Sequence, residues 1–226
     1  MSLVIAIDGP SGSGKSTLAK RLAAHYGLQY LDTGSTYRAA TVWALKNGAD
    51  LDDTEVVARL TREMPLEVVT DPAGSRYLLD GEDVTDQLHT GDVSSVVSKV
   101  AVNLEVRAEL KRLQREIIDS SRESGGVVAE GRDVTTVVAP DADVRILLIA
   151  DPEERLARRA VDRHGKADAD SIEATKHEVL DRDASDSTVS QFMEARDGVF
   201  TLDNSAMVPD ESFAAGVQIV ETALRG

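Results

Sequence analysis

Eight consecutive residues near the start of the chain have the types and the spacing of a phosphate-binding loop. Gly9-Pro10-Ser11-Gly12-Ser13-Gly14-Lys15-Ser16 matches the pattern G-x-x-x-x-G-K-[ST] at every fixed position. Small residues let backbone N–H groups point inward around a β-phosphate, and a helix that starts at the end of the loop favours an anion. We therefore expect Lys15 to contact the β- and γ-phosphate oxygens of ATP. Ser16 is the expected Mg²⁺ ligand, in a donor site that extends to Thr17.

The residues around this loop have the pattern of strands that alternate with helices. The apolar run Leu3–Ile7 predicts a buried strand before the loop, and Lys15–Tyr26 has the spacing of an amphipathic helix after it. Four more apolar runs, separated by helical segments, predict further strands at 28–31, 127–130, 144–150 and 199–202. We expect an α/β fold whose five-stranded parallel sheet is flanked by helices.

Two other segments complete the expected organisation. Short strand candidates at Leu66–Val69 and Tyr77–Leu79 flank a turn at 71–74, which predicts a small antiparallel insertion. The segment from 93 to 121 is mostly helical, and Asn103 has the residue type of an N-cap that restarts the helix after a break.

The composition limits the classes of protein that fit this chain. It has 226 residues, a formal net charge of −15 and no cysteine. Such an acidic chain does not favour a broad nucleic-acid-binding face, so an anionic substrate must be bound in a local positive pocket. The absence of cysteine excludes disulfides, and no apolar run approaches the roughly 20 residues of a membrane span. We expect a cytoplasmic monomer with neither a nucleic-acid polymer nor a membrane as partner.

A phosphate-binding loop alone does not name the reaction, because GTPases, ATPases and small-molecule kinases all have one. The chain lacks the N-K-x-D sequence that GTPases use for guanine. Motor and transporter ATPases are usually longer and end a strand with Asp-Glu, whereas this chain reads Asp151-Pro152-Glu153 at the corresponding kind of position. A small-molecule kinase remains the best interpretation of the motif.

Four other segments resemble bacterial cytidylate kinases, in the order in which that family has them. They are Tyr30-Leu31-Asp32-Thr33-Gly34-Ser35-Thr36-Tyr37-Arg38, the segment 130–142 that begins Glu130-Gly131-Arg132-Asp133, the segment Glu154-Arg155-Leu156-Ala157-Arg158-Arg159, and Arg182-Asp183-Ala184-Ser185-Asp186-Ser187-Thr188. The insertion near 64–85 also stands where that family has an extra small sheet. With the phosphate-binding loop, the resemblance extends over nearly the whole chain.

The resemblance implies a fold like that of the P-loop nucleoside monophosphate kinases and transfer of phosphate from ATP to CMP or dCMP. It implies a single kinase domain over 1–226, with a core at about 1–34, 86–150 and 195–226, a monophosphate-binding region at about 35–107 and a lid at about 152–185. Small-molecule nucleotides (CMP, dCMP and ATP) are the implied partners. The implied acceptor-site residues are Asp32 and Thr33 as support, Arg38 and Arg132 for the acceptor phosphate, Ser98, Arg107 and Asp133 for the cytosine edge, and Arg182 and Asp186 for the ribose.

Chemistry makes several of these roles reasonable. A planar guanidinium binds oxyanions through two parallel hydrogen bonds, and a carboxylate accepts from the exocyclic amine of cytosine, which uracil lacks. Ser98 and Arg107 are half a turn out of phase on an unbroken helix, so they converge only if the chain breaks near Asn103. Arg155 and Arg159 share a helix face, which two arginines need if both are to close over the transferring phosphate. Together with Lys15 and Arg132 they are the expected catalytic residues.

Two points stay open on the residues alone. Glu130 ends a strand near the phosphate-binding loop, where it either holds Mg²⁺ through water or is a plain buried acid at the edge of the sheet. The overall function has two alternatives: a kinase for another small acceptor such as a sugar acid or shikimate, and a regulatory module that binds nucleotides without catalysis.

The chain departs from the family pattern at three places. Val189 stands where the family usually has an arginine that binds the acceptor phosphate. Gln191-Phe192-Met193 stands near the place of a Ser-Pro-Leu segment. Thr135 replaces a glycine, so we expect backbone freedom to be lost there. The first departure favours the regulatory alternative, and all three concern the acceptor side.

Overall fold

The computed structural model describes residues 2–190 and 192–225, and in the helix at 169–187 it excludes the side chains of residues 177, 178, 180–182, 185 and 186. The strands are β1 (Leu3–Asp8), β2 (Gln29–Asp32), β3 (Leu66–Val69), β4 (Arg76–Leu79), β5 (Glu82–Asp83), β6 (Gly126–Gly131), β7 (Val144–Ile149) and β8 (Phe200–Asp203). The α-helices are α1 (Lys15–Tyr26), α2 (Thr33–Lys46), α3 (Thr54–Arg62), α4 (Gly91–Ala101), α5 (Leu104–Arg122), α6 (Pro152–His164), α7 (Ala169–Ser187) and α8 (Pro209–Arg225). Two short helical turns are η1 (Gln87–His89) and η2 (Val134–Val138).

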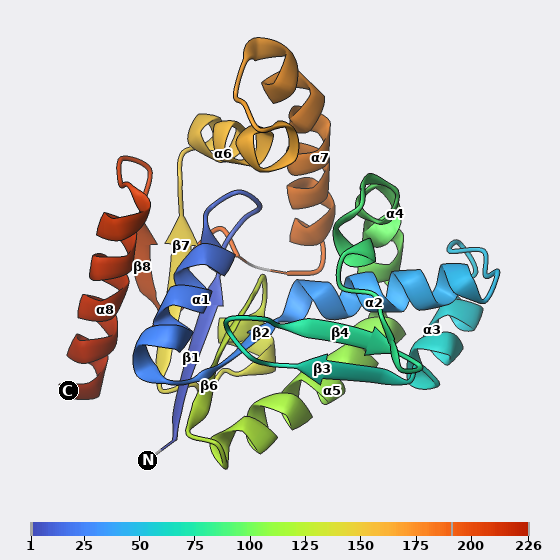
Figure 1. Ribbon diagram of the computed structural model, residues 1–226, viewed down its shortest axis with the longest axis horizontal. Helices are drawn as coiled ribbons and strands as arrows, with labels where there is room; N and C mark the ends of the chain where they lie inside the picture. Colours follow the sequence, from blue (N-terminus) through green and yellow to red (C-terminus); the bar gives the residue numbers. More distant parts are fainter. Residues whose placement is uncertain (1, 191, 226) are drawn as a thin grey trace.

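Five strands form one parallel sheet in the order β2-β6-β1-β7-β8, which confirms the predicted sheet (Figure 1). β1 and β6 run level with each other, since Ile7 pairs with Glu130 and Asp8 with Gly131. The phosphate-binding loop follows β1, and Arg132 and Asp133 follow β6. The register therefore brings these two segments to the same edge of the sheet, where ligands bind in open α/β folds.

The apolar sequence of β1 is explained by burial on both of its faces. Ile5 and Ile7 belong to a core cluster with side chains of α1 and α8, whereas Val4 and Ala6 belong to a cluster with α5 and η2. Figure 1 shows α1 and α8 on one face of the sheet and α5 on the other. The strand that carries the phosphate-binding loop is thus held rigidly from both sides.

A second group of elements, comprising α2, α3, α4 and a small sheet of order β3-β4-β5, lies beside the main sheet (Figure 1). The predicted antiparallel insertion is confirmed, with β5 as a strand that the sequence did not indicate. The predicted helix break is also confirmed: the Asn103 side chain accepts from the backbone N–H groups of Glu105 and Val106, at 3.1 and 3.3 Å, and starts α5. The helix α3 was not predicted.

The helices α6 and α7 lie above the carboxyl ends of the sheet strands (Figure 1). The residue pattern at 171–180 is typical of a helix, and α7 extends beyond it to Ser187. No helix in the described part of the chain combines the length and the apolar character of a membrane span.

Candidate active site

The phosphate-binding loop packs so closely that two of its glycines have no room for a side chain. A Cβ atom on Gly9 would lie 2.2 Å from the carbonyl oxygen of Leu148 at the end of β7, and one on Gly12 would lie 2.5 Å from that of Arg155 in α6. Gly12 also has a φ of +76°, in the left-handed region that favours glycine. The loop then passes into the N-terminus of α1, as the motif predicts.

The polar residues at the end of the loop meet a buried carboxylate from β6. Lys15 Nζ donates to the carbonyl oxygen of Pro10 at 2.9 Å, within the loop itself. Ser16 Oγ donates to Glu130 Oε1 at 2.5 Å, and the Tyr30 hydroxyl donates to the same oxygen at 3.0 Å. Burial and the neighbouring carboxylate of Asp32 raise the pKa of Glu130 to about 7. This carboxylate is therefore poised to gain or lose a proton near neutrality.

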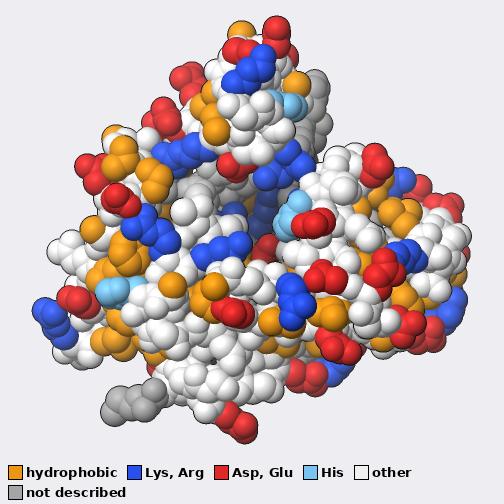
Figure 2. Space-filling view, in the orientation of Figure 1, with side chains coloured by type: hydrophobic (Ala, Val, Ile, Leu, Met, Phe, Trp, Pro, Cys, Tyr) orange, Lys and Arg blue, Asp and Glu red, His pale blue; other side chains and the backbone are white. Residues whose placement is uncertain are grey.

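A cavity of about 220 Å³ extends from the loop toward α2, α4 and α5. Five basic side chains line it, namely Lys15, Arg38, Arg107, Arg132 and Arg159, as do four carboxylates, namely Asp32, Glu130, Asp133 and Asp162. Figure 2 shows basic side chains gathered around this hollow below α6 and α7. In a chain with a net charge of −15, the basic side chains of this cavity thus at least balance its carboxylates where an anionic substrate would bind.

Two of the lining arginines are the residues predicted to bind an acceptor phosphate. Arg38 on α2 is buried and donates to the Leu88 carbonyl oxygen at 2.8 Å and to Ser94 Oγ at 2.9 Å. Arg132 pairs with Asp183 of α7 at 3.0 Å. Both guanidinium groups reach the same cavity, although their positions in the sequence are far apart.

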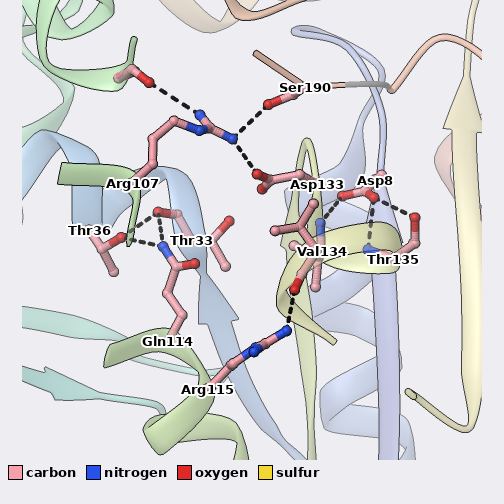
Figure 3. Close-up of polar contacts among 12 residues, drawn as sticks. Asp8, Thr33, Thr36, Arg107, Gln114, Arg115, Asp133, Val134, Thr135 and Ser190 are labelled. Atoms are coloured by element: carbon pink, nitrogen blue, oxygen red, sulfur yellow. Dashed lines mark hydrogen bonds and ion pairs between the residues drawn. The ribbon is translucent and has the colours of Figure 1, made fainter. Parts of the chain in front are cut away.

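A third lining arginine, Arg107, forms a polar cluster with Asp133 and Ser190 (Figure 3). Its Nη2 atom donates to the Asp133 carboxylate and to Ser190 Oγ, the latter at 2.9 Å. The break before α5 brings Arg107 into one cavity with Val97 of α4, the neighbour of the Ser98 that the helix-phase argument paired with Arg107. Ser98 is half-buried and is not among the lining residues, so its role in reading the base stays a prediction.

The supporting residues of the acceptor site hold the end of β2 and the start of α2. Asp32 and Thr33 both line the cavity. The Asp32 carboxylate accepts from the Ser35 hydroxyl at 2.6 Å, and Thr33 Oγ1 donates to the Glu130 carbonyl oxygen at 2.8 Å. The side chains of Arg182 and Asp186, the predicted ribose ligands, lie outside the described residues.

The two predicted lid arginines differ in their positions. Arg159 lines the cavity, whereas Arg155 is buried and donates to the carbonyl oxygen of Ser11 in the loop at 3.0 Å. Arg155 also pairs with Asp183, whose carboxylate accepts the backbone N–H of Ser11 at 3.2 Å and pairs with Arg132. Asp183 thus connects the loop, α6 and the acceptor side. It lies within a segment that carried the family resemblance, yet no pattern in the sequence indicates this contact.

A second cavity, of about 430 Å³, lies on the other side of the loop and was not predicted. It shares Gly12, Gly14, Thr17 and Asp162 with the first cavity and is otherwise lined mostly by α1, by α6 and by the chain from Asn204 into the start of α8. Arg158 on α6 donates to the Asn204 side-chain and main-chain oxygens, both at 2.9 Å. No motif marks these residues, because the cavity exists only where three separate elements meet.

The loop after β6 is anchored by a buried acid of β1. The Asp8 carboxylate accepts the backbone N–H groups of Val134 and Thr135, both at 2.8 Å, and the Thr135 hydroxyl at 2.6 Å (Figure 3). Burial raises the pKa of Asp8 to about 6. Among the described residues other than glycine only Asp80 has a positive φ, so Thr135 stands in place of glycine without backbone strain and adds a hydrogen bond.

The oxygen atoms near the loop suit a magnesium ion. The Ser16 hydroxyl and the Glu130 carboxylate lie side by side, and Mg²⁺ prefers such oxygen ligands. Within the ranges that the structure describes, no three His, Cys, Asp or Glu side chains gather as a metal site. The donor set therefore fits an ion that takes most of its ligands from phosphate and water.

Comparison with known proteins identifies the family. The family model described as "Cytidylate kinase" matches residues 5–222. The chain belongs to the cytidylate kinase family. A protein named cytidylate kinase from Streptomyces griseus is 41% identical over 222 residues, which cover 97% of this chain and 93% of that protein. A cytidylate kinase from Rhodococcus opacus is 42% identical over 212 residues, covering 93% of this chain and 91% of that protein.

Solved structures agree with this cytidylate kinase family member at the level of the fold. An uncharacterised protein from Eubacterium ventriosum has a TM-score of 0.54 and 14% identity, with 98% of this chain and 99% of that chain covered. The low identity limits this likeness to the fold.

Proposed function

We propose that this member of the cytidylate kinase family transfers the γ-phosphoryl group of ATP to CMP or dCMP in the cavity beside its phosphate-binding loop. One observation carries the proposal: a single cavity is lined both by Lys15 and Ser16 and by Arg38, Arg132 and the Arg107–Asp133 pair. A donor cradle and an anion-binding acceptor site that share one cavity allow transfer without an intermediate carrier.

In this proposal the two parts of ATP, its phosphates and its adenosine, bind at two different sites. Its phosphates bind the loop Gly9–Ser16, with Lys15 at the β/γ oxygens, and its adenosine enters the second cavity, where Arg158 and Asn204 line the wall. Ser16, with Glu130 acting directly or through water, would hold Mg²⁺, which neutralises phosphate charge when bound. Ionised Glu130 is the form that suits a cation.

The acceptor divides into phosphate, base and ribose in the first cavity. Arg38 and Arg132 bind the phosphate, because guanidinium groups match its oxygens. Asp133, oriented by Arg107, accepts from the exocyclic amine of cytosine, and this hydrogen bond would be lost with uracil. Ser98, Arg182 and Asp186 complete the acceptor site in this proposal.

Catalysis then rests on position and charge rather than on a strong base, because a phosphate acceptor is already ionised. Lys15 and Arg132 stabilise the charge of the transferring group, and Arg155 and Arg159 contribute from the lid. Closure of the lid would exclude water and limit the hydrolysis of ATP. The regions at about 35–107 and 152–185 act as the monophosphate-binding region and the lid of one kinase domain, and the enzyme works as a cytoplasmic monomer.

A panel of acceptors tests the proposal. The purified protein is incubated with ATP, Mg²⁺ and each of CMP, dCMP, UMP, AMP, GMP, shikimate and a sugar acid, and the formation of ADP is followed. We expect CMP and dCMP to give the highest kcat/KM. Preferred turnover of a hydroxy acid would support a kinase for another acceptor, and no ADP with any acceptor would support a regulatory module.

A further inference from the structure

The segment that departs most from the family pattern contacts both kinds of acceptor-site arginine. Val189, Ser190 and Phe192, which we call the acceptor strap, connect the end of α7 to the chain that leads into β8. Ser190 is 9% exposed and Phe192 is 1% exposed. Ser190 and Phe192 are therefore packed into the molecule, directly after the position where the family usually has an arginine.

Ser190 restrains the orientation of Arg107. The guanidinium of Arg107 has three acceptors from three separate segments: the Asp133 carboxylate, Ser190 Oγ at 2.9 Å and the carbonyl oxygen of Ala101 at 3.2 Å (Figure 3). Both protons of Nη2 are used, one by Asp133 and one by Ser190. Since a guanidinium is planar, two acceptors on Nη2 and one on Nη1 fix both its plane and its rotation.

Phe192 restrains Arg132 as Ser190 restrains Arg107. The Cζ atom of Arg132 lies 4.7 Å from the centre of the Phe192 ring, within the range of a cation–π contact. Asp183 pairs with the same guanidinium at 3.0 Å, so Arg132 is held by an ion pair and by an aromatic face. The Arg132 side chain is 13% exposed, and this partial burial strengthens the attraction to the ring.

We propose that the acceptor strap takes over part of the task of the absent arginine by positioning the arginines that remain: Ser190 sets Arg107 for reading the base, and Phe192 sets Arg132 for binding the phosphate. The proposal rests on the acceptor-site roles given above. Ser190 and Phe192 are positioning residues, since each acts through an arginine. The strap therefore has two separable effects, one on base preference and one on phosphate affinity.

Ser190→Ala tests the first effect, with Ser190→Thr as the matched control that keeps a hydroxyl. We expect Ser190→Ala to lower the ratio of kcat/KM for CMP to that for UMP by about three- to tenfold, the loss of one hydrogen bond on a base-reading group. KM for ATP should stay within about twofold of the wild-type value. Ser190→Thr should restore most of the ratio.

Phe192→Leu tests the second effect, with Phe192→Tyr as the control that keeps an aromatic face. We expect Phe192→Leu to raise KM for CMP and for UMP by the same factor, about two- to tenfold, because both substrates have the same phosphate. The ratio of CMP to UMP should not change. Thermal unfolding of all four variants separates a loss of position from a loss of fold.

The proposal requires that Ser190→Ala change the CMP to UMP ratio and that Phe192→Leu change KM for both substrates alike. An unchanged CMP to UMP ratio in Ser190→Ala, or a lower melting temperature as the sole effect of both variants, would overturn it and leave the strap as packing alone. Failure of the function itself would appear differently, as wild-type protein that does not turn over CMP in the same assay. A variant that does not fold leaves the other variant to decide, because Ser190 and Phe192 contact different arginines.

Discussion

The donor loop and the acceptor site are built in opposite ways, although they share one cavity. The donor loop is one run of eight residues that follows β1 and ends in the first turn of α1. The proposed acceptor site takes Arg38 from α2, Arg107 from α5, Asp133 from the segment after β6 and Ser190 from the strap. The donor loop can therefore be recognised in one stretch of sequence, although β7, α6 and Asp183 also contact it, whereas the proposed acceptor site forms only in the folded chain. Substitutions in one region should therefore leave the binding of the other region's substrate largely unchanged.

Lys15→Ala is the substitution with the largest expected effect, because it removes the cation of the donor loop. We expect kcat with CMP to fall by about 10³-fold or more, as for the loss of one main stabiliser of transition-state charge. A coupled assay of ADP formation measures this. The exposed Lys20→Ala on the same helix is the control and should retain near-normal turnover. Turnover close to wild type in Lys15→Ala would refute the assignment of the loop to the donor.

Asp133→Ala should act on the acceptor side alone and alter selectivity more than rate. We expect the ratio of kcat/KM for CMP to that for UMP to fall by about ten- to a hundredfold, since cytosine loses its acceptor and Arg107 loses its ion pair. KM for ATP should change little. Asp141→Ala, a largely exposed acid later in the same segment, is the control. An unchanged ratio would remove Asp133 from base reading.

The contrast between the two regions also explains what could be predicted from the sequence. The loop, the five strands of the sheet and the helix restart at Asn103 were predicted, because each depends on residues near one another in the chain. The meeting of Arg107 with Asp133 was expected only through the family resemblance. Their contact depends on how α5 packs beside β6, and no short-range pattern reports such packing.

Other features of the site left no readable signal. Asp183 pairs with Arg132 and Arg155, and the sequence alone would allow these arginines to pair with surface acids instead. The second cavity is bounded by separate elements, so no single segment indicates it. The substitution of glycine by Thr135 was expected to cost backbone freedom. This prediction was incomplete, because it could not include the buried acceptor Asp8 that gives the hydroxyl a partner.

Glu130→Gln tests the residue that lies between the donor loop and the acceptor site. Glu130 accepts a hydrogen bond from Ser16 of the loop and lies near the carboxylate of Asp32. Burial raises the pKa of Glu130 from its usual 4.5 to about 7, so the folded protein holds a proton that the unfolded chain releases in this range. The free energy of unfolding contributed by this group is therefore present below pH 4.5 and falls as the pH rises through 7. Glutamine cannot ionise, so this dependence disappears in the variant.

We expect Glu130→Gln to be more stable than wild type at pH 8 by about 1–3 kcal/mol, and the difference to shrink toward pH 5. Urea unfolding at both pH values, without nucleotide or Mg²⁺, measures it. The exposed Glu63→Gln is the control and should show no such trend. A difference independent of pH would mean that Glu130 keeps one protonation state throughout.

Thr135→Val has the smallest expected effect and tests the direct tie between the two regions. Asp8 directly precedes the donor loop, and its carboxylate accepts from Thr135, just after the acceptor residues Arg132 and Asp133. Valine keeps the branched shape but loses the hydroxyl, so we expect the free energy of unfolding to fall by about 1 kcal/mol. Thr135→Ser keeps the hydroxyl and should stay close to wild type in urea unfolding.

The kinetics of Thr135→Val show which region depends on the hydrogen bond between Thr135 and Asp8. If Asp8 fixes the loop after β6, the lost hydrogen bond should raise KM for CMP by about two- to threefold and leave KM for ATP unchanged, because the loop Gly9–Ser16 is also held by its contacts with β7 and α6. A rise in KM for ATP instead would mean that the donor loop depends on the acceptor segment for its shape. The two regions would then not be independent, because the contacts of the loop with β7 and α6 would not be enough to hold its shape.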